Sequence, residues 1–288
     1  MNGRITLLTD FGDQDGYVGA MKGVIATHAP NAHIVDIGHH IPAGHIRQAS
    51  FVLWSASRYW PAGTTHLAVV DPTVGSERRA VAVAVDDQVY FAPDNGLLSD
   101  VLAATDMPVN AIELDNDAFW HHPVSPTFHG RDIFASCASY LVAGVPLIAL
   151  GSTVDPDSLV KLPTPRLEGG GGKVIGEIVS VDRFGNAITN VTADIVAKAG
   201  EGLVVGVGET VISGVSQVFA DVPEGQPLIY VGSSGRLEIA VNGGSAAQRF
   251  SLAVPIEPPQ ALGRSTLIAL GIAPLPVEPR EEQRLTIR

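Results

Sequence analysis

Four polar side chains in the first half of the chain follow short apolar segments, and their types suit acid–base chemistry or ligand binding. Asp10 follows RITLLT, and Asp71 follows HLAVV. Arg78 lies in the Pro/Gly turn after Asp71, and His129 lies in PTFHGRD. A carboxylate, a guanidinium group and an imidazole can together orient a water molecule or a polar ligand. Taken alone, the turn could equally be a loop whose charges are solvated.

A second set of polar and aromatic residues lies in the last third of the chain. It comprises DRFGN from Asp182 to Asn186, Phe219, and SSGRLEIAVN from Ser233 to Asn242. Each has an ordinary structural interpretation, because DRFGN can be a hairpin turn, a phenylalanine is usually core and Glu238 can face solvent on an alternating strand. Only their joint occurrence favours a binding site.

The elements that position Asp10 and Asp71 follow from the apolar pattern. Three strands are expected, at Arg4 to Thr9, His33 to Ile37 and HLAVV, with helices over Tyr17 to His28 and IRQASFVLWSASRYW between them. This βαβαβ order predicts parallel strands with right-handed connections. Both aspartates then lie at one edge of one sheet, where open α/β folds bind their ligands.

Further along, RAVAVAVDDQVYFAPDNG predicts two strands joined at Asp86-Asp87. LLSDVLAA is expected to be helical and AIEL a short strand. IFASCASYLVAG predicts another helix, so His129 stands just before a helix N-terminus, where backbone N–H groups favour anions.

The composition changes at LPTPRLEGGGG, which predicts an inter-domain linker. We expect an N-terminal α/β domain with a mainly parallel sheet over residues 1–162, a Pro/Gly linker over 163–172 and a smaller all-β, barrel-like domain over 173–288. Residues from about 258 receive no assignment.

Composition limits the partners. The formal charge of −12, with no run of lysine or arginine, argues against nucleic acid and against an anionic membrane. Cys137 is the only cysteine, so no disulfide forms within the chain. Without an apolar leader or a span-length apolar stretch, we expect a cytoplasmic protein that binds a small molecule.

Several common sites are missing from the sequence. There is no HExxH, CxxC, Walker A, GxGxxG or GxSxG motif. The pairs His39-His40 and His121-His122 point to opposite sides of an extended chain, so we expect no metal, with a metal-dependent hydrolase as the weaker alternative.

The chain resembles the S-adenosyl-L-methionine (SAM) hydroxide adenosyltransferases, which are siblings of the fluorinase and chlorinase. The resemblance is carried by TDFGxxDxYVGxxKG, VVDPTVGSERR, APDNGLL, PTFHGRDIFA, DRFGNAITN and GSSGRLEIAVN, in that order. It implies an α/β domain followed by a β-barrel, SAM as substrate without a cofactor, and a homotrimer whose sites lie between subunits.

The resemblance also implies roles for individual residues. Asp71, Arg78 and His129 would form the hydrolase signature, and Asp10 would bind the ribose hydroxyls. Asn186 would face the adenine or the amino-acid end, Asp182 or Glu238 the ammonium group, and Ser233 the carboxylate. The remaining binding candidates are Phe219, Tyr230 and Asn242.

Three differences from the halogenases are visible. Where they enclose the sugar with an aromatic residue, this chain reads Ile41-Pro42-Ala43-Gly44-His45, and their arginine beside the carboxylate-binding serine is Ser234 here. Asp71 replaces their tyrosine, and an ionised carboxylate opposes a desolvated halide.

The leading hypothesis is therefore hydrolysis of SAM to adenosine and L-methionine by water attacking C5′. We also expect a preference for the R sulfonium epimer, on the ground that destroying the cell's methyl donor would be costly. The alternatives are a non-catalytic sensor of adenosyl ligands and a SAM-dependent halogenase.

Overall fold

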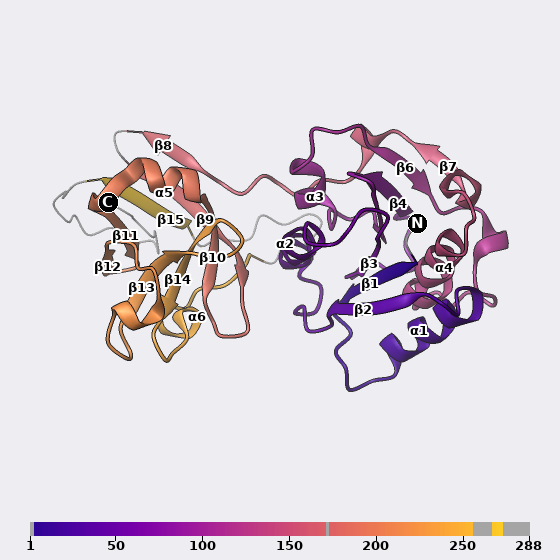
Figure 1. Cartoon of the computed structure of the whole chain (residues 1–288), viewed down its shortest axis with the longest axis horizontal. Helices are drawn as coiled ribbons and strands as arrows, with labels where there is room; N and C mark the ends of the chain where they lie inside the picture. The colour runs from indigo at the N-terminus through magenta and orange to yellow at the C-terminus, as the bar shows by residue number, and fades with distance from the viewer. Residues whose placement is uncertain (1–2, 171–172, 256–266, 273–288) are drawn as a thin grey trace. The chain divides into compact units, whose positions relative to one another are not determined.

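A computed structural model describes residues 3–170, 173–255 and 267–272 of the chain. They belong to two compact units, Met1–Leu162 and Pro163–Arg288 (Figure 1).

The first unit is built on a seven-stranded sheet. In spatial order its strands are β2 (His33–Gly38), β1 (Arg4–Thr9), β3 (Thr65–Val69), β5 (Gln88–Pro93), β4 (Ala80–Val85), β6 (Asn110–Glu113) and β7 (Ser152–Val154). Strands β2, β1, β3 and β5 are mutually parallel, which confirms the predicted βαβαβ arrangement.

The prediction of a mainly parallel sheet is wrong, because β4, β6 and β7 are all paired antiparallel. The cause for β4 is local. Asp86 and Asp87 both adopt positive φ, at 50° and 60°, which makes a tight two-residue hairpin between β4 and β5. The sheet is therefore mixed.

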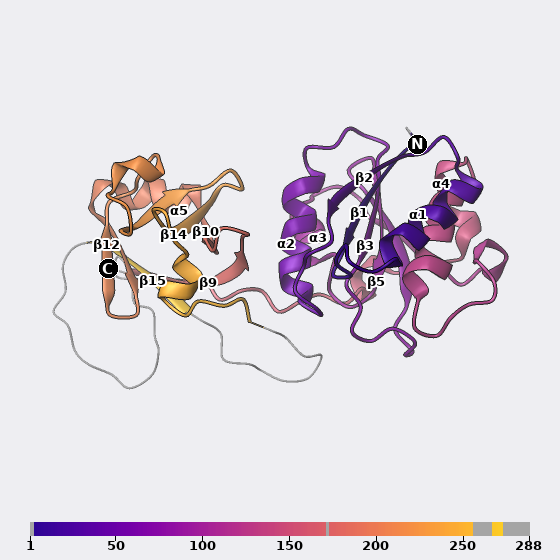
Figure 2. The same cartoon turned by 90° about the horizontal axis from the view of Figure 1, so that it is seen from below.

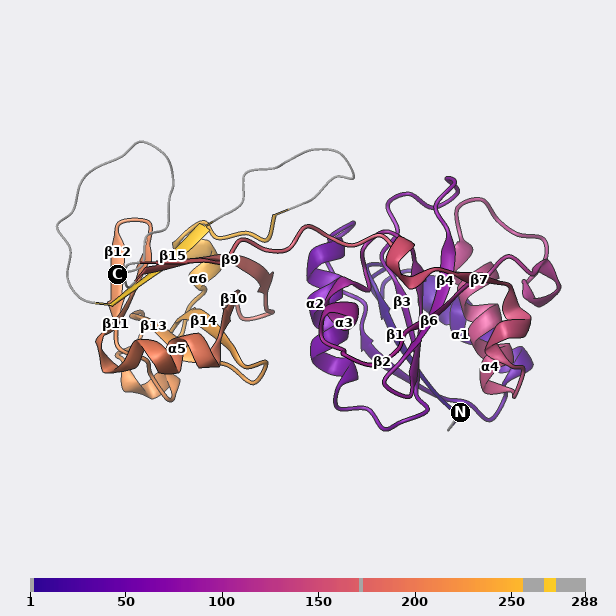
Figure 3. The same ribbon diagram turned by 90° about the horizontal axis from the view of Figure 1, so that it is seen from above.

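Helices cover both faces of this sheet (Figures 2 and 3). On one face lie α1 (Tyr17–His28), the π-helical turn η2 (Gly130–Ala135) and α4 (Ser136–Val142), whose Cys137 is fully buried. On the other face lie α2 (Ile46–Ser57) and α3 (Ser99–Ala103). Three short 3₁₀ turns complete the unit, η1 (Asp117–Phe119), η3 (Leu147–Leu150) and η4 (Pro156–Ser158).

The amphipathic pattern explains this layering. On α1 the buried residues Val18, Met21 and Ile25 recur at the spacing of one helix face, as do Ile46, Ala49 and Leu53 on α2. Strand β3, by contrast, is buried along its whole length because helices cover both of its faces.

The second unit contains an antiparallel sheet of eight strands. The path runs β12 (Thr210–Ser213), β11 (Leu203–Val207), β15 (Leu267–Ile272), β9 (Lys173–Val181), β10 (Ala187–Thr192), β14 (Arg236–Val241) and β13 (Pro227–Val231), and β8 (Glu168–Gly170) pairs with β9. Its helical segments are α5 (Ala193–Ala199), η5 (Gly200–Gly202), η6 (Phe219–Asp221) and α6 (Ala246–Arg249).

Two stretches contribute strands that the sequence did not predict. Within the predicted linker over 163–172, residues 168–170 form β8, while residues 171–172 lie outside the described part of the chain. The unassigned tail from about 258 contributes β15, which inserts between β9 and β11, and the rest of that tail is not described.

Candidate active site

Asp71 and Arg78 form a buried ion pair at the carboxyl end of β3. Arg78 donates from Nε and Nη2 to the same oxygen, Oδ2 of Asp71, at 2.8 Å and 2.5 Å. Only 4% of the Asp71 side chain and 8% of the Arg78 side chain are exposed. The guanidinium group also lies over the ring of Phe134, 5.5 Å from its centroid. Burial of this kind makes the pair rigid, because an unpaired charge there would be costly.

His129 is joined to this pair through the arginine. Arg78 Nη2 donates to His129 Nδ1 at 3.0 Å. Because a guanidinium group can only donate, Nδ1 must hold a lone pair, so the imidazole is neutral and carries its proton on Nε2. The pKa of His129 is lowered from 6.5, first by burial and then by the charge of Arg78.

The protonation state of His129 is a direct test of this geometry. An NMR titration is expected to give a pKa below 6.5, because the charged form would face Arg78 and lose its hydrogen bond. Replacing Arg78 by alanine should raise the pKa, since it removes a repelling charge while Asp71 remains. A value at or above 6.5 in the unsubstituted protein would contradict the assigned tautomer.

The loops that carry these residues touch at Gly75. Its φ of +81° lies in the left-handed region, and a Cβ there would lie 2.5 Å from the carbonyl oxygen of Pro126. A glycine is therefore required at this position for two reasons, the backbone conformation and the close approach of the two loops. This contact sets the separation between the Asp71–Arg78 loop and the segment that carries His129.

Asp10 lies at the end of β1, and since β1 and β3 are adjacent parallel strands, it lies at the same edge as Asp71. Its Oδ2 accepts a hydrogen bond from the backbone N–H of Gly44 at 2.9 Å. Burial raises the pKa of Asp10, and the charge of Asp71 adds to the rise. The carboxylate is thus anchored through one oxygen, which leaves the other able to accept hydrogen bonds from a ligand.

Three aromatic rings beside these carboxylates were not among the predicted site residues. Phe11, Tyr17 and Phe128 form a cluster with centroid separations of 5.3–6.0 Å, and Tyr17 is 51% exposed. Phe11 and Phe128 immediately adjoin Asp10 and His129 in sequence. The positions of these two rings next to Asp10 in TDFG and next to His129 in PTFHG were the signal in the sequence that could have identified them. They offer an apolar surface in a chain that lacks the aromatic residue at Ile41 to His45.

In the second unit, Asp182 acts as a turn former. Its Oδ1 accepts from the backbone N–H groups of Phe184 and Asn186 at 2.9 Å and 2.8 Å, and its Oδ2 accepts from Asn186 Nδ2 at 2.8 Å. The structural interpretation of DRFGN is therefore realised. Asn186 Oδ1 is buried and has no hydrogen-bond partner among the described residues, so this acceptor is available to a ligand.

The structure brings Glu238, Tyr230 and Phe219 together near this turn. Tyr230 Oη donates to Glu238 Oε2 at 2.5 Å, and the rings of Tyr230 and Phe219 are 5.3 Å apart. Glu238 is 8% exposed, and its pKa is raised, first by burial and further by the charge of Asp182. Buried Glu238 and partly buried Asp182 together favour a cationic ligand group.

Ser233 and Asn242 are placed differently. Ser233 lies in the turn closed by hydrogen bonds between Gly232, Gly235 and Arg236, next to Ser234, whose buried Oγ has no partner in the described residues. Asn242 donates its side-chain N–H to the carbonyl of Val222 at 2.8 Å. That bond holds the backbone after η6 and uses one of the two N–H groups of the amide, so the predicted binding role of Asn242 stays a prediction.

Across residues 3–170, 173–255 and 267–272 there is no cluster of three or more metal-ligating side chains. None of the helices in the same ranges has the length and apolar character of a membrane span.

Comparison with known proteins identifies the family of the chain. Residues 5–151 match the SAM hydroxide adenosyltransferase N-terminal domain, and residues 176–256 match the C-terminal domain. The (R)-S-adenosyl-L-methionine hydrolase of Salinispora tropica is 41% identical over 84% of this chain and 92% of its own length. The enzyme of that name from Thermus thermophilus is also 41% identical, over 86% and 95%.

More distant relatives include a fluorinase from an Actinoplanes species, which is 27% identical over 86% of this chain and 94% of its own. Among solved structures, an uncharacterized conserved protein from Thermotoga maritima superposes with a TM-score of 0.82. It is 36% identical and covers 93% of this chain and 99% of its own. The chain belongs to the SAM hydroxide adenosyltransferase family.

Proposed function

We propose that this protein hydrolyses (R)-S-adenosyl-L-methionine to adenosine and L-methionine by attack of water on C5′. The observation that carries the proposal is the buried Asp71–Arg78 pair joined to neutral His129. The names of the two relatives at 41% identity support the reaction and the epimer.

The arrangement suits water as the nucleophile. Both short bonds from Arg78 go to Asp71 Oδ2, while Oδ1 receives the Thr73 hydroxyl only at 3.4 Å, a long contact that a water molecule can replace. Asp71 Oδ1 thus accepts a hydrogen bond from water and turns an oxygen lone pair toward C5′. His129 keeps its Nδ1 lone pair for Arg78, so it acts by holding Arg78 in place.

Departure of the leaving group needs no acid. As the C5′–O bond forms, the C5′–S bond breaks, and its electron pair neutralises the sulfonium to a thioether. The oxygen that has attacked becomes a protonated alcohol, which is strongly acidic. A carboxylate therefore suffices as the acceptor, and Asp71 Oδ1 takes the proton and returns it to solvent.

The two sets of residues divide the recognition of the substrate. Asp10 accepts hydrogen bonds from the ribose hydroxyls, and the cluster of Phe11, Tyr17 and Phe128 packs beside the sugar. Asn186 Oδ1 and the Glu238–Tyr230 pair accept the donor groups of the adenine or methionine end, with Ser233 directed to the carboxylate. We propose a cytoplasmic homotrimer in which the two sets come from different subunits.

For the second unit, we propose that the sheet closes into a barrel. The backbone N–H of Ser216, just after β12, donates to the carbonyl of Ile229 in β13 at 2.8 Å, which links the two end strands of the path. An experimental structure in which β12 and β13 are separated would overturn this closure.

The reaction is tested by incubating the purified protein with separated R and S epimers in chloride or fluoride buffer. Adenosine and L-methionine are expected in equal amounts from the R epimer, unchanged by exhaustive chelation. Stable binding without product would indicate a sensor, and 5′-halogenated adenosine a halogenase. Light scattering on the same sample should give a trimer, and an active monomer would contradict the shared site.

A further inference from the structure

Two adjacent residues, Asp94 and Asn95, hold the two ends of the loop that carries Asp71 and Arg78. They follow β5, in the segment APDNG, and neither belongs to the site described above. Asn95 forms a hydrogen bond with the residue just before Asp71, and Asp94 forms hydrogen bonds with the residue just after Arg78. A single dipeptide therefore spans the base of the loop.

Asn95 holds the first end. Its Nδ2 donates to the backbone carbonyl of Val70 at 2.9 Å, and its Oδ1 accepts from the backbone N–H of Leu97 at 3.2 Å. The second bond fixes the side-chain rotamer, so the amide is aimed at Val70. The carbonyl of Val70 belongs to the peptide bond that leads into Asp71, and holding it orients the start of the loop.

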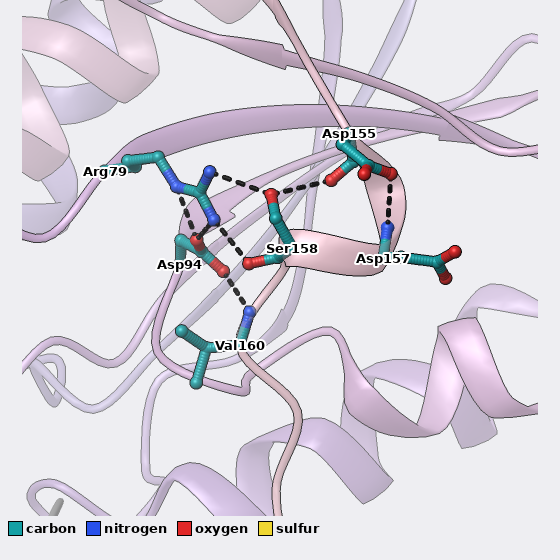
Figure 4. Close-up of polar contacts among 6 residues, drawn as sticks. All are labelled: Arg79, Asp94, Asp155, Asp157, Ser158 and Val160. Atoms are coloured by element: carbon teal, nitrogen blue, oxygen red, sulfur yellow. Dashed lines mark hydrogen bonds and ion pairs between the residues drawn. The ribbon is translucent and has the colours of Figure 1, made fainter.

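Asp94 holds the second end. Its Oδ2 accepts from Arg79 Nε at 2.8 Å and from Nη2 at 2.5 Å (Figure 4). The backbone N–H of Asp94 donates to the carbonyl of Arg79 at 3.0 Å. Asp94 Oδ1 accepts from the backbone N–H of Val160 at 2.8 Å. Arg79 is in turn fixed by the hydroxyl and carbonyl oxygens of Ser158, at 3.1 Å and 2.7 Å.

We call Asp94, Asn95 and the hydrogen bonds that they make the brace. It is stiffer than an exposed ion pair. The Asp94 side chain is 5% exposed. Both of its carboxylate oxygens accept hydrogen bonds, one from Arg79, which Ser158 also holds, and the other from the backbone N–H of Val160. Since Arg79 and Arg78 are neighbours, a shift of Arg79 moves the guanidinium group that pairs with Asp71.

We infer that Asp94 and Asn95 are positioning residues for the hydrolysis, because they fix the two ends of the loop over residues 71–78. The inference rests on the proposed function. A misplacement of about 1 Å costs on the order of 100-fold in rate. Loosening the brace should therefore lower kcat and leave KM nearly unchanged, since neither residue contacts the proposed ribose or methionine groups.

The chain offers a matched control at Asn116. Its Nδ2 donates to the carbonyl of Ala149 at 2.8 Å and its Oδ1 accepts from the N–H of Ala118 at 3.3 Å, so it makes the same two bonds as Asn95 at another loop. Asn95→Ala and Asn116→Ala should lower the melting temperature alike. Only Asn95→Ala should lower kcat, by about 100-fold. In an Arg78→Ala background, Asn95→Ala should lower kcat little further, because the group that it positions is already gone.

A second measurement, by NMR, does not depend on turnover. The ¹⁵N resonance of His129 Nδ1, assigned with His129→Gln, should move in Asn95→Ala and stay in place in Asn116→Ala. If Asn95→Ala does not fold, Asn95→Asp with Asn116→Asp replaces the pair, because aspartate keeps the shape and the acceptor oxygen while a charged oxygen takes the place of the donor in both variants. Equal kcat and an unmoved His129 resonance in the paired variants would overturn the brace. No adenosine from the unsubstituted protein would instead overturn the proposed function, and the resonance would then decide the brace.

Discussion

Replacing Asp71 by asparagine is expected to lower kcat on the order of 1,000-fold while the dissociation constant for SAM stays nearly unchanged. Asparagine keeps the shape of the side chain and can still accept a bond from Arg78. It lacks the negative charge that orients water and takes its proton. Rapid-quench measurement of adenosine formation, with calorimetric binding of the substrate, separates the two quantities.

Two companion variants sharpen this expectation. Asp115→Asn alters a carboxylate whose Oδ1 accepts from the N–H of Ser152 at 2.8 Å, so it tests the loss of an aspartate outside the site and should leave kcat unchanged. Asp10→Ala should give the opposite pattern, with weaker binding and a smaller change in kcat. Near-normal hydrolysis by Asp71→Asn would show that another group activates the water.

Gly75→Ala is expected to lower kcat about 100-fold through the backbone alone. The new methyl group would stand 2.5 Å from the carbonyl oxygen of Pro126, so the two loops must separate, and Arg78 then loses its hold on His129. The left-handed φ adds about 1–2 kcal/mol to the cost of folding. Steady-state kinetics and thermal unfolding measure the two effects.

Gly144→Ala provides the comparison for this substitution. Gly144 has a φ of +107°, but a Cβ there meets no atom within 4 Å. The variant should therefore lose stability without losing activity. Equal kcat in Gly75→Ala and Gly144→Ala would show that the loop contact does not set the catalytic geometry.

Local pattern was sufficient to predict the elements that end at Asp10 and Asp71. The helical spacing of Val18, Met21 and Ile25 and the apolar run before Asp71 are properties of contiguous residues, and the parallel βαβαβ order follows from them. The turn role of Asp182 was equally open to prediction, because its partners lie within four residues.

Contacts between distant segments were not predictable in this way. Strand β7 has three residues and β6 four, which is too short for direction to be encoded locally. The pairing of β15 with β9 joins residues nearly a hundred positions apart, and the bond from Asn95 to Val70 links segments that no periodicity connects. The side-chain network that holds the loop over residues 71–78 therefore required the three-dimensional structure.

The solitary buried thiol has a practical use for biophysics. Burial raises the pKa of Cys137 to about 12, and its Sγ contacts the carbonyl of Phe119 at 3.7 Å, so thiolate-directed reagents meet an unreactive group in the native protein. A cysteine introduced at an exposed position, such as Val211 on β12 with 63% exposure, would then be the sole point of attachment for a spin label or a fluorophore. Distances between labels on associated copies could be read without first removing the natural residue.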